Sequence, residues 1–219
     1  MIRITGDHNR ATRNVLENGK PGGNNSNLPA AVEVVRGSHN RIDHNEVANW
    51  HRRGLRVIPT DSTTENRIDH NYLHDFSRIP PDIDSNMGDA FQVGLSGLHS
   101  AMKAGTIIEY NLGERLEADG ELVSLKSSSN IVRFNTLKDS NASLNIRHGA
   151  DNQIIGNTLI KMKRLSVYGD NHQIIGNDLQ NTPLVIARGG TTETRLHQGK
   201  EDGKWKHPAA RTRWWRATG

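Results

Sequence analysis

Two short segments of this chain bring together the side chains that acid–base chemistry needs. The first runs Asp-Gly-Glu-Leu-Val-Ser-Leu-Lys-Ser and contains Asp119, Glu121 and Lys126. The second runs Asn-Ile-Arg-His-Gly and contains Arg147 and His148. Both segments have the composition of β-strands, and residues two apart on a strand point to the same face, so Asp119 and Glu121 are expected side by side.

Two carboxylates on one face repel each other unless a positive group lies between them. Lys126 or Arg147 could supply that charge, and so could a hard cation such as Ca²⁺, which prefers carboxylate and amide oxygens. Carboxylates beside a lysine and an arginine are the parts needed to remove a proton next to a carboxylate, which indicates an enzyme. The alternative from the residues alone is a set of solvated surface ion pairs, because charged side chains mostly lie exposed.

The elements that position these residues must suit an unusually polar chain. The chain has 219 residues, of which 33% are hydrophobic and 5% aromatic, as expected for one domain with a narrow core and many polar ladders. It has no cysteine, which excludes disulfides and thiolate metal sites. No apolar run reaches the ~18 residues that span a membrane. The first residues lack the apolar stretch of a signal peptide.

The positive charge is concentrated at the C-terminal end. Residues 191–219 hold seven basic and three acidic side chains, and this difference of four equals the whole formal net charge of +4. The rest of the chain is neutral overall, so the basic balance is poor evidence for nucleic-acid binding. Three tryptophans accompany the basic residues. We expect this tail to cap the domain or be disordered rather than to bind an anionic polymer.

A repeated phrase sets the fold. Copies such as Arg-Ile-Asp-His-Asn and Gln-Ile-Ile-Gly-Asn end on asparagines at positions 14, 45, 71, 111, 135, 157 and 177. Their spacing of 31, 26, 40, 24, 22 and 20 residues is typical of a solenoid with insertions. Short β-rich clusters alternate with turn residues, and no segment keeps a helical period.

These features predict an all-β protein, a right-handed parallel β-helix of roughly seven to eight coils over residues 1–190. Each closing asparagine is expected at the same corner of its coil, where it can adopt left-handed backbone geometry and bond along the stack. The long intervals before Asn45 and Asn111 are expected to hold loops that leave the solenoid. His44 and His70 occupy equivalent places in two coils, and we expect them on one exposed side as candidate substrate contacts, with plain surface residues as the alternative.

With its asparagine corners and the two segments described above, the chain resembles polysaccharide lyase family 6, which includes alginate lyases and chondroitinase B. The match is densest from about Ser85 to Asn177, and the lysine and arginine of its motifs lie 21 residues apart. The resemblance implies that Lys126 is the catalytic base and that Arg147 acts as, or assists, the general acid. It further implies a Ca²⁺ site formed by Asn86, Asp119 and Glu121.

The same resemblance places His148, which follows the arginine, at the substrate. It departs from the family at Asp119, where the family has glutamate, and the chain is shorter than the family's members. The function implied is calcium-assisted β-elimination of an anionic uronate polysaccharide. Alginate is favoured over dermatan sulfate as the substrate, and a secreted or periplasmic location is expected. The alternatives are a non-catalytic carbohydrate-binding β-helix and a uronate C5-epimerase, which begins with the same proton removal.

Overall fold

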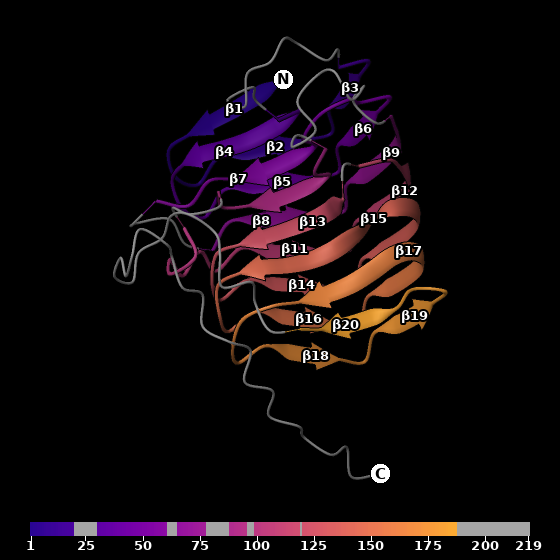
Figure 1. Ribbon diagram of the computed structural model, residues 1–219. Coiled ribbons are helices and arrows are strands. Elements are labelled where there is room, and N and C mark those ends of the chain that lie inside the picture. The colour runs from indigo at the N-terminus through magenta and orange to yellow at the C-terminus, as the bar shows by residue number, and fades with distance from the viewer. Residues whose placement is uncertain (20–29, 61–64, 78–87, 96–98, 119, 188–219) are drawn as a thin grey trace, which may run out of the picture.

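The structure is a computed structural model that describes residues 1–19, 30–60, 65–77, 88–95, 99–118 and 120–187. Over these ranges the chain forms twenty β-strands and no helix, and the strands wind into a solenoid (Figure 1). Every strand pairs in parallel with the equivalent strand of an adjacent coil, for example β5 with β8 and β8 with β11. The fold is therefore the all-β parallel β-helix that the repeats predict. None of the described residues forms a helix long and apolar enough to cross a membrane.

Each coil contributes a strand to three faces of the solenoid. Face 1 is built from β1 (Ile2–Thr5), β4 (Val32–Arg36), β7 (Leu55–Val57), β10 (Phe91–Val93), β13 (Glu121–Lys126) and β20 (Leu184–Ile186). Face 2 is the seven-stranded sheet of β2 (Arg10–Thr12), β5 (Arg41–Asp43), β8 (Arg67–Asp69), β11 (Ile107–Glu109), β14 (Ile131–Arg133), β16 (Gln153–Ile155) and β18 (Gln173–Ile175). Face 3 is built from β3 (Val15–Glu17), β6 (Glu46–Ala48), β9 (Tyr72–Phe76), β12 (Leu112–Leu116) and β19 (Asp178–Gln180).

Two long strands turn the corner from face 3 to face 1. The first half of β15 (Thr136–His148) pairs with β12, and its second half pairs with β13. β17 (Thr158–Val167) does the same one coil later, pairing with β19 and then with β20. Faces 1 and 3 are consequently joined into one thirteen-stranded sheet.

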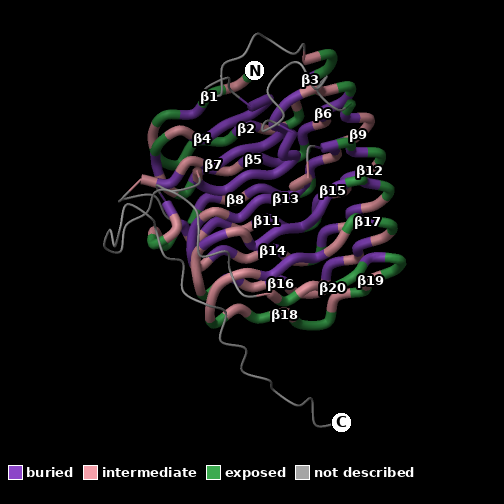
Figure 2. The backbone as a smooth tube through the Cα atoms, viewed as in Figure 1, coloured by how far each residue is buried: buried purple, intermediate pink, exposed green. Residues whose placement is uncertain are grey.

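The core is a narrow stack of mainly aliphatic side chains inside the coils, with Phe76 and Phe91 among them. On the three-residue strands of face 2 only the middle residue points inward, and Ile42, Ile68 and Ile108 lie in register there, almost fully buried. One inward residue per strand accounts for the low apolar fraction of the sequence, since the flanking residues face outward. The strands are buried along the solenoid, and exposure increases toward β18 and β19 at the C-terminal end (Figure 2).

The corners between faces 2 and 3 are held by the predicted asparagine ladder. Asn71 shows the repeating pattern, because its backbone N–H and its Nδ2 both donate to Oδ1 of Asn111, at 2.9 Å each. The ladder runs coil by coil from Asn14 to Asn177. The expectation that the asparagine itself takes left-handed geometry is wrong. The residue before it does so, as at His70 with φ 54°, because the turn is made there and the asparagine side chain then bonds the freed backbone groups.

The corner between faces 1 and 2 has a second ladder, which the sequence analysis did not separate from the first. It includes Asn40, whose backbone N–H donates to Oδ1 of Asn66 at 2.9 Å, and Asn130, whose N–H donates to Oδ1 of Asn152 at 2.9 Å. His172 takes the place of the asparagine in the last coil and accepts from the N–H of Asn152 through Nδ1. The loops predicted before Asn45 and Asn111 fall largely at 20–29, 78–87 and 96–98, and the C-terminal tail at 191–219, all outside the described residues.

Candidate active site on face 1

The candidate site is built on two neighbouring strands of face 1, β13 and the second half of β15. Val123 and Leu125 of β13 point into the core and are almost fully buried, so the alternate residues Ser124 and Lys126 point outward. The register pairs Ser124 with Asn145 of β15. It shifts at both ends of the pairing, between Glu121 and Val123 and between Leu125 and Lys126. These irregularities change the direction in which the side chains on either side of them point.

Glu121 is the centre of the hydrogen-bond network at the site. Its Oε1 accepts from Nη1 of Arg147 at 2.6 Å and from Nδ2 of Asn145 at 2.9 Å. Its Oε2 accepts from the hydroxyl of Ser124. Two strands from successive coils therefore hold both oxygens of one carboxylate, and its orientation is fixed before any ligand arrives.

Lys126 lies between two carboxylates. Its Nζ is 3.7 Å from Oε2 of Glu121 and 3.7 Å from Oδ2 of Asp89, which precedes β10 in the preceding coil. The side chains of Lys126, Glu121 and Asp89 are 12%, 14% and 6% exposed. An amine so placed is largely removed from solvent while one edge remains accessible.

The electrostatics of Glu121 favour its ionised form. Burial acts to raise the pKa of this carboxyl, but the positive charges of Lys126 and Arg147, with hydrogen bonds from Ser124 and Arg147, outweigh burial and hold the pKa below its ordinary value. The carboxylate is thus charged at neutral pH.

The structure brings together three of the residues predicted from the sequence, Lys126, Arg147 and Glu121. His148 is the register partner of Lys126 and is buried at the end of β15. Its contact with a substrate stays a prediction. Asn86 and Asp119, the other two predicted metal ligands, lie outside the described residues.

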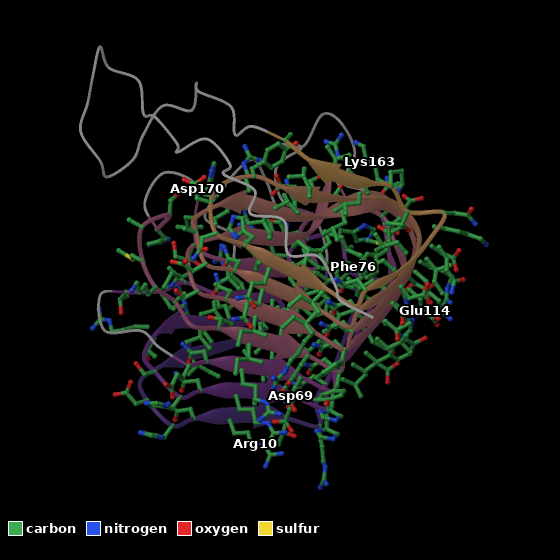
Figure 3. All side chains as sticks on the ribbon, turned by 90° about the horizontal axis from the view of Figure 1, so that it is seen from below. Arg10, Asp69, Phe76, Glu114, Lys163 and Asp170 are labelled. Atoms are coloured by element: carbon green, nitrogen blue, oxygen red, sulfur yellow. The ribbon has the colours of Figure 1, made fainter. Side chains whose placement is uncertain are left out.

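His44 and His70 lie elsewhere, at the corner between faces 2 and 3. Their rings stack at 5.1 Å between centroids, both side chains are about half exposed, and each Nδ1 lies within hydrogen-bond distance of the preceding aspartate, Asp43 or Asp69. The expectation that they share one exposed side is confirmed, and their role in substrate contact stays a prediction. Figure 3 shows Asp69 near Arg10 on one wall of the solenoid, with Glu114 of face 3 on a different part of the surface.

Three residues of the site were missed by the sequence analysis: Asp89, Ser124 and Asn145. Strand alternation carries a signal for two of them, because Ser124 is two residues before Lys126 and Asn145 is two residues before Arg147. Asp89 had no such signal, since only the stacking of coils brings it to Lys126.

The oxygen atoms at the site are of the chemical type that a hard cation binds. Glu121 and Asp89 direct carboxylate oxygens toward the same amine, and Ca²⁺ takes carboxylate ligands. No cluster of three or more histidine, cysteine, aspartate or glutamate side chains placed to hold a metal occurs among the residues that the structure describes. The described part of the chain therefore supplies two carboxylate groups toward the 6–8 oxygens that Ca²⁺ requires.

Fold and site together define a parallel β-helix protein with a lysine, an arginine and paired carboxylates on one face. The family model for chondroitinase B matches residues 2–183, and the chain belongs to this family, polysaccharide lyase family 6. Comparison with curated proteins found no match.

Two solved structures are similar to the chain. One is a mannuronic-acid-specific family 6 polysaccharide lyase from the human gut microbiota, with a TM-score of 0.70 and 25% identity over 90% of this chain and 49% of that one. The other is a mutant of the family 6 alginate lyase AlyGC, with a TM-score of 0.59 and 22% identity over 84% of this chain and 31% of that one. The second likeness bears on the fold alone. The chain spans about half the length of the first structure and about a third of the second.

Proposed function

We propose that the chain is a polysaccharide lyase that cleaves a uronate-containing polymer, alginate before dermatan sulfate, by calcium-assisted β-elimination. The observation that carries the proposal is the placement of Lys126 against Glu121 and Asp89, with Arg147 bonded to the same Glu121. Membership of a lyase family supports it. A secreted or periplasmic location belongs to the same proposal.

In the proposed reaction Lys126 acts as the base. Its neutral amine takes the proton from C5 of the uronate, the electron pair of that C–H bond forms a double bond between C4 and C5, and the bond from C4 to the glycosidic oxygen breaks. Arg147 binds the substrate carboxylate and donates a hydrogen bond toward the departing oxygen. Guanidinium gives up its own proton reluctantly, so the departing oxygen takes its proton from a water molecule that Arg147 orients and leaves as the hydroxyl of the second product.

The difficulty of this reaction is charge, because a carbanion forms beside an existing carboxylate. Ca²⁺ bound at the site would supply a Lewis acid for that carboxylate. Glu121 and Asp89 would hold it, together with Asn86 and Asp119 as the family resemblance implies. Ser124 and Asn145 keep Glu121 oriented for that task.

The experiment that tests the proposal is the ultraviolet absorbance of the unsaturated uronate, measured with alginate and with dermatan sulfate, with and without a calcium chelator. We expect absorbance to rise with alginate and to stop on chelation. If neither polymer gives unsaturated product under calcium-replete conditions, the lyase proposal fails.

A second candidate function is a non-catalytic carbohydrate-binding β-helix. It is favoured by one observation, that both carboxylate oxygens of Glu121 are already bonded by the side chains of Ser124, Asn145 and Arg147. Polymer binding without unsaturated product would select it. Exchange of the C5 proton with solvent, again without cleavage, would select the epimerase instead.

A further inference from the structure

A row of outward polar side chains follows face 1 from coil to coil through the candidate active site. Gln92 of β10 pairs with Ser124 of β13, Ser124 with Asn145 of β15, and Asn145 with Ser166 of β17. Neighbouring strands lie ~4.8 Å apart, so these four side chains form a line along the solenoid. We call them the polar row. Ser124 and Asn145 contact Glu121, which fixes the row beside the carboxylate of the site.

Three members of the polar row carry a side-chain oxygen that is buried and unbonded. Oε1 of Gln92, Oδ1 of Asn145 and Oγ of Ser166 have no hydrogen-bond partner within the part of the chain that the structure describes. All three residues are at least nine-tenths buried. Buried oxygens are costly to leave unpaired, and a fold keeps several of them in line where a ligand or ordered water completes the bonds.

The orientation of the Asn145 amide is fixed by its neighbour. Nδ2 donates to Oε1 of Glu121 at 2.9 Å, and an ionised carboxylate can only accept. Oδ1 must therefore be the unpaired atom. The polar row consequently offers a hydrogen-bond acceptor immediately beside the carboxylate of the candidate site.

The cation next to the row is already engaged. Arg56 of β7 is the register partner of Gln92 and donates through Nε and Nη2 to Oε2 of Glu33, which is fully buried. Glu33 also lies 3.0 Å from Nε of Arg3. A guanidinium held in this way is poorly placed to turn toward an anion in the row, so recognition along the row depends on neutral acceptors.

We infer that the polar row is a subsite for unsubstituted sugar hydroxyls, with Gln92 and Asn145 as acceptors, and that it selects unsulfated over O-sulfated uronate chains. The inference rests on the proposed function and specifies its substrate class. A hydroxyl can donate to Oε1 of Gln92 or Oδ1 of Asn145. A sulfate ester has only acceptor oxygens, so Oδ1 of Asn145, whose amide orientation is fixed by Glu121, would remain unpaired beside it and repel it.

The substrate approaches from the side of Arg147, whose side chain is about a third exposed. Its guanidinium and the Lys126 amine are suited to the uronate carboxylate, whereas the polar row is suited to hydroxyls. One face thus separates the recognition of charge from the recognition of hydroxyl groups.

The test measures binding, by calorimetry, of oligomannuronate and of the same oligomer after O-sulfation. The protein is the full chain carrying Lys126→Ala, which prevents turnover during titration, in calcium-containing buffer. We expect the unsulfated oligomer to bind at least about tenfold more tightly. Adding Gln92→Met, which keeps the volume and removes the acceptor, should weaken the unsulfated oligomer about tenfold and leave the sulfated one unchanged.

Two further variants keep the experiment interpretable. Ser166→Ala removes the third unpaired oxygen with minimal change of shape, and it should also weaken binding of the unsulfated oligomer. This variant carries the test if Gln92→Met does not fold. The matched control is Gln153→Met on face 2, a glutamine of the same solenoid away from the row, which should change neither affinity. Circular dichroism establishes that each variant is folded.

Equal affinity for the two oligomers in the Lys126→Ala protein overturns the inference. So does unchanged binding by folded Gln92→Met and Ser166→Ala proteins, which would mean that the oxygens hold only water. In the remaining case Oε1 of Gln92 binds Ca²⁺ and not a sugar hydroxyl. A calcium titration detects this case, because the Gln92→Met protein would then bind Ca²⁺ more weakly, and the inference would be overturned. These outcomes are measured without cleavage, so they are independent of whether the parent chain forms unsaturated product.

Discussion

Lys126 lies between carboxylates from two different coils, and its contribution to the rate of the proposed reaction can be tested by removing it alone. Replacing it with alanine removes the proposed base and leaves Glu121 bonded to Ser124, Asn145 and Arg147. Positioned acid–base groups typically contribute ~10²–10⁴-fold to rate, so we expect Lys126→Ala to lose about that much lyase activity. Initial rates of unsaturated-product formation check this.

The matched control for that substitution is Lys138→Ala. Lys138 also pairs with a glutamate, its Nζ lying 2.8 Å from Oε2 of Glu114, but it is on face 3. The control should keep the parent rate. A Lys126→Ala protein that cleaves as fast as the parent would remove the base assignment.

How far the site could be predicted from the sequence depends on which distances the chain itself sets. Glu121 and Lys126 share one strand, and Arg147 follows one coil later, so strand alternation and the repeat together were enough to group them. Asp89 could not be found in this way. Its distance from Lys126 is set by the register of β10 on β13, which no local pattern encodes.

At the level of strands and turns, the asparagine ladder was predictable and the turn geometry was not. The repeated asparagine marks the corner in every coil. The left-handed residue before it is Arg13, His44, Tyr110 or Phe134 in different coils, with no shared side-chain chemistry. Its conformation is imposed by the corner and tolerated because the asparagine bonds the backbone around it.

Asn111 tests how much one rung of the ladder contributes. Its Nδ2 donates to the carbonyls of Ile68 and Glu109 and to Asn135, and its Oδ1 accepts from Asn71. Asn111→Ala leaves several buried groups unpaired at about 1–3 kcal/mol each. We therefore expect a loss of at least ~3 kcal/mol in the free energy of unfolding, measured by urea denaturation.

The end of the same ladder provides the comparison. Asn177 donates to the carbonyls of Ile154 and Ile175 and is partly exposed, so water can replace its bonds. Asn177→Ala should cost clearly less than Asn111→Ala. Equal losses at the two positions would show that burial of the rung does not set its contribution.

Face 3 carries a network of charges that links stability to pH. Hydrogen bonds from Lys138, Tyr72 and Arg115 lower the pKa of Glu114 to about 2, from an ordinary 4.5. A lowered pKa in the folded state means that the network stabilises the fold above about pH 4.5 and that this contribution is lost as the pH falls toward 2.

Glu114→Gln should therefore destabilise the protein at neutral pH and have a diminishing effect in acid. The measurement is the difference in unfolding free energy between parent and variant across the acid range. Glu65→Gln, at a mostly exposed side chain, is the control and should show little dependence. A Glu114→Gln effect that is constant with pH would contradict the assigned titration.

Taken as one molecule, the solenoid explains why so polar a chain folds. Each coil buries few residues, but the coils cover one another, and Ile42, Ile68 and Ile108 form part of a continuous stack. The sequence predicted this architecture because its period survives the insertions. It could not predict that Gln92 and Ser166 line up with Ser124 and Asn145, since that register is set between coils whose separation along the chain varies.

The stability of such a stack should depend on position along its axis. Ile68 is fully buried between β5 and β11, so Ile68→Ala should cost about 2–5 kcal/mol of unfolding free energy. Ile174 is its counterpart on β18, where the described chain places a neighbour, β16, on one side only. Because Ile174 is only partly buried, Ile174→Ala should cost less than half as much.

Hydrogen exchange should show the amides of β18 opening locally before those of β8, as expected when each coil contacts only its neighbours. Uniform protection from β8 to β18, with equal costs for the two substitutions, would instead indicate a single cooperative unit whose end is as stable as its middle.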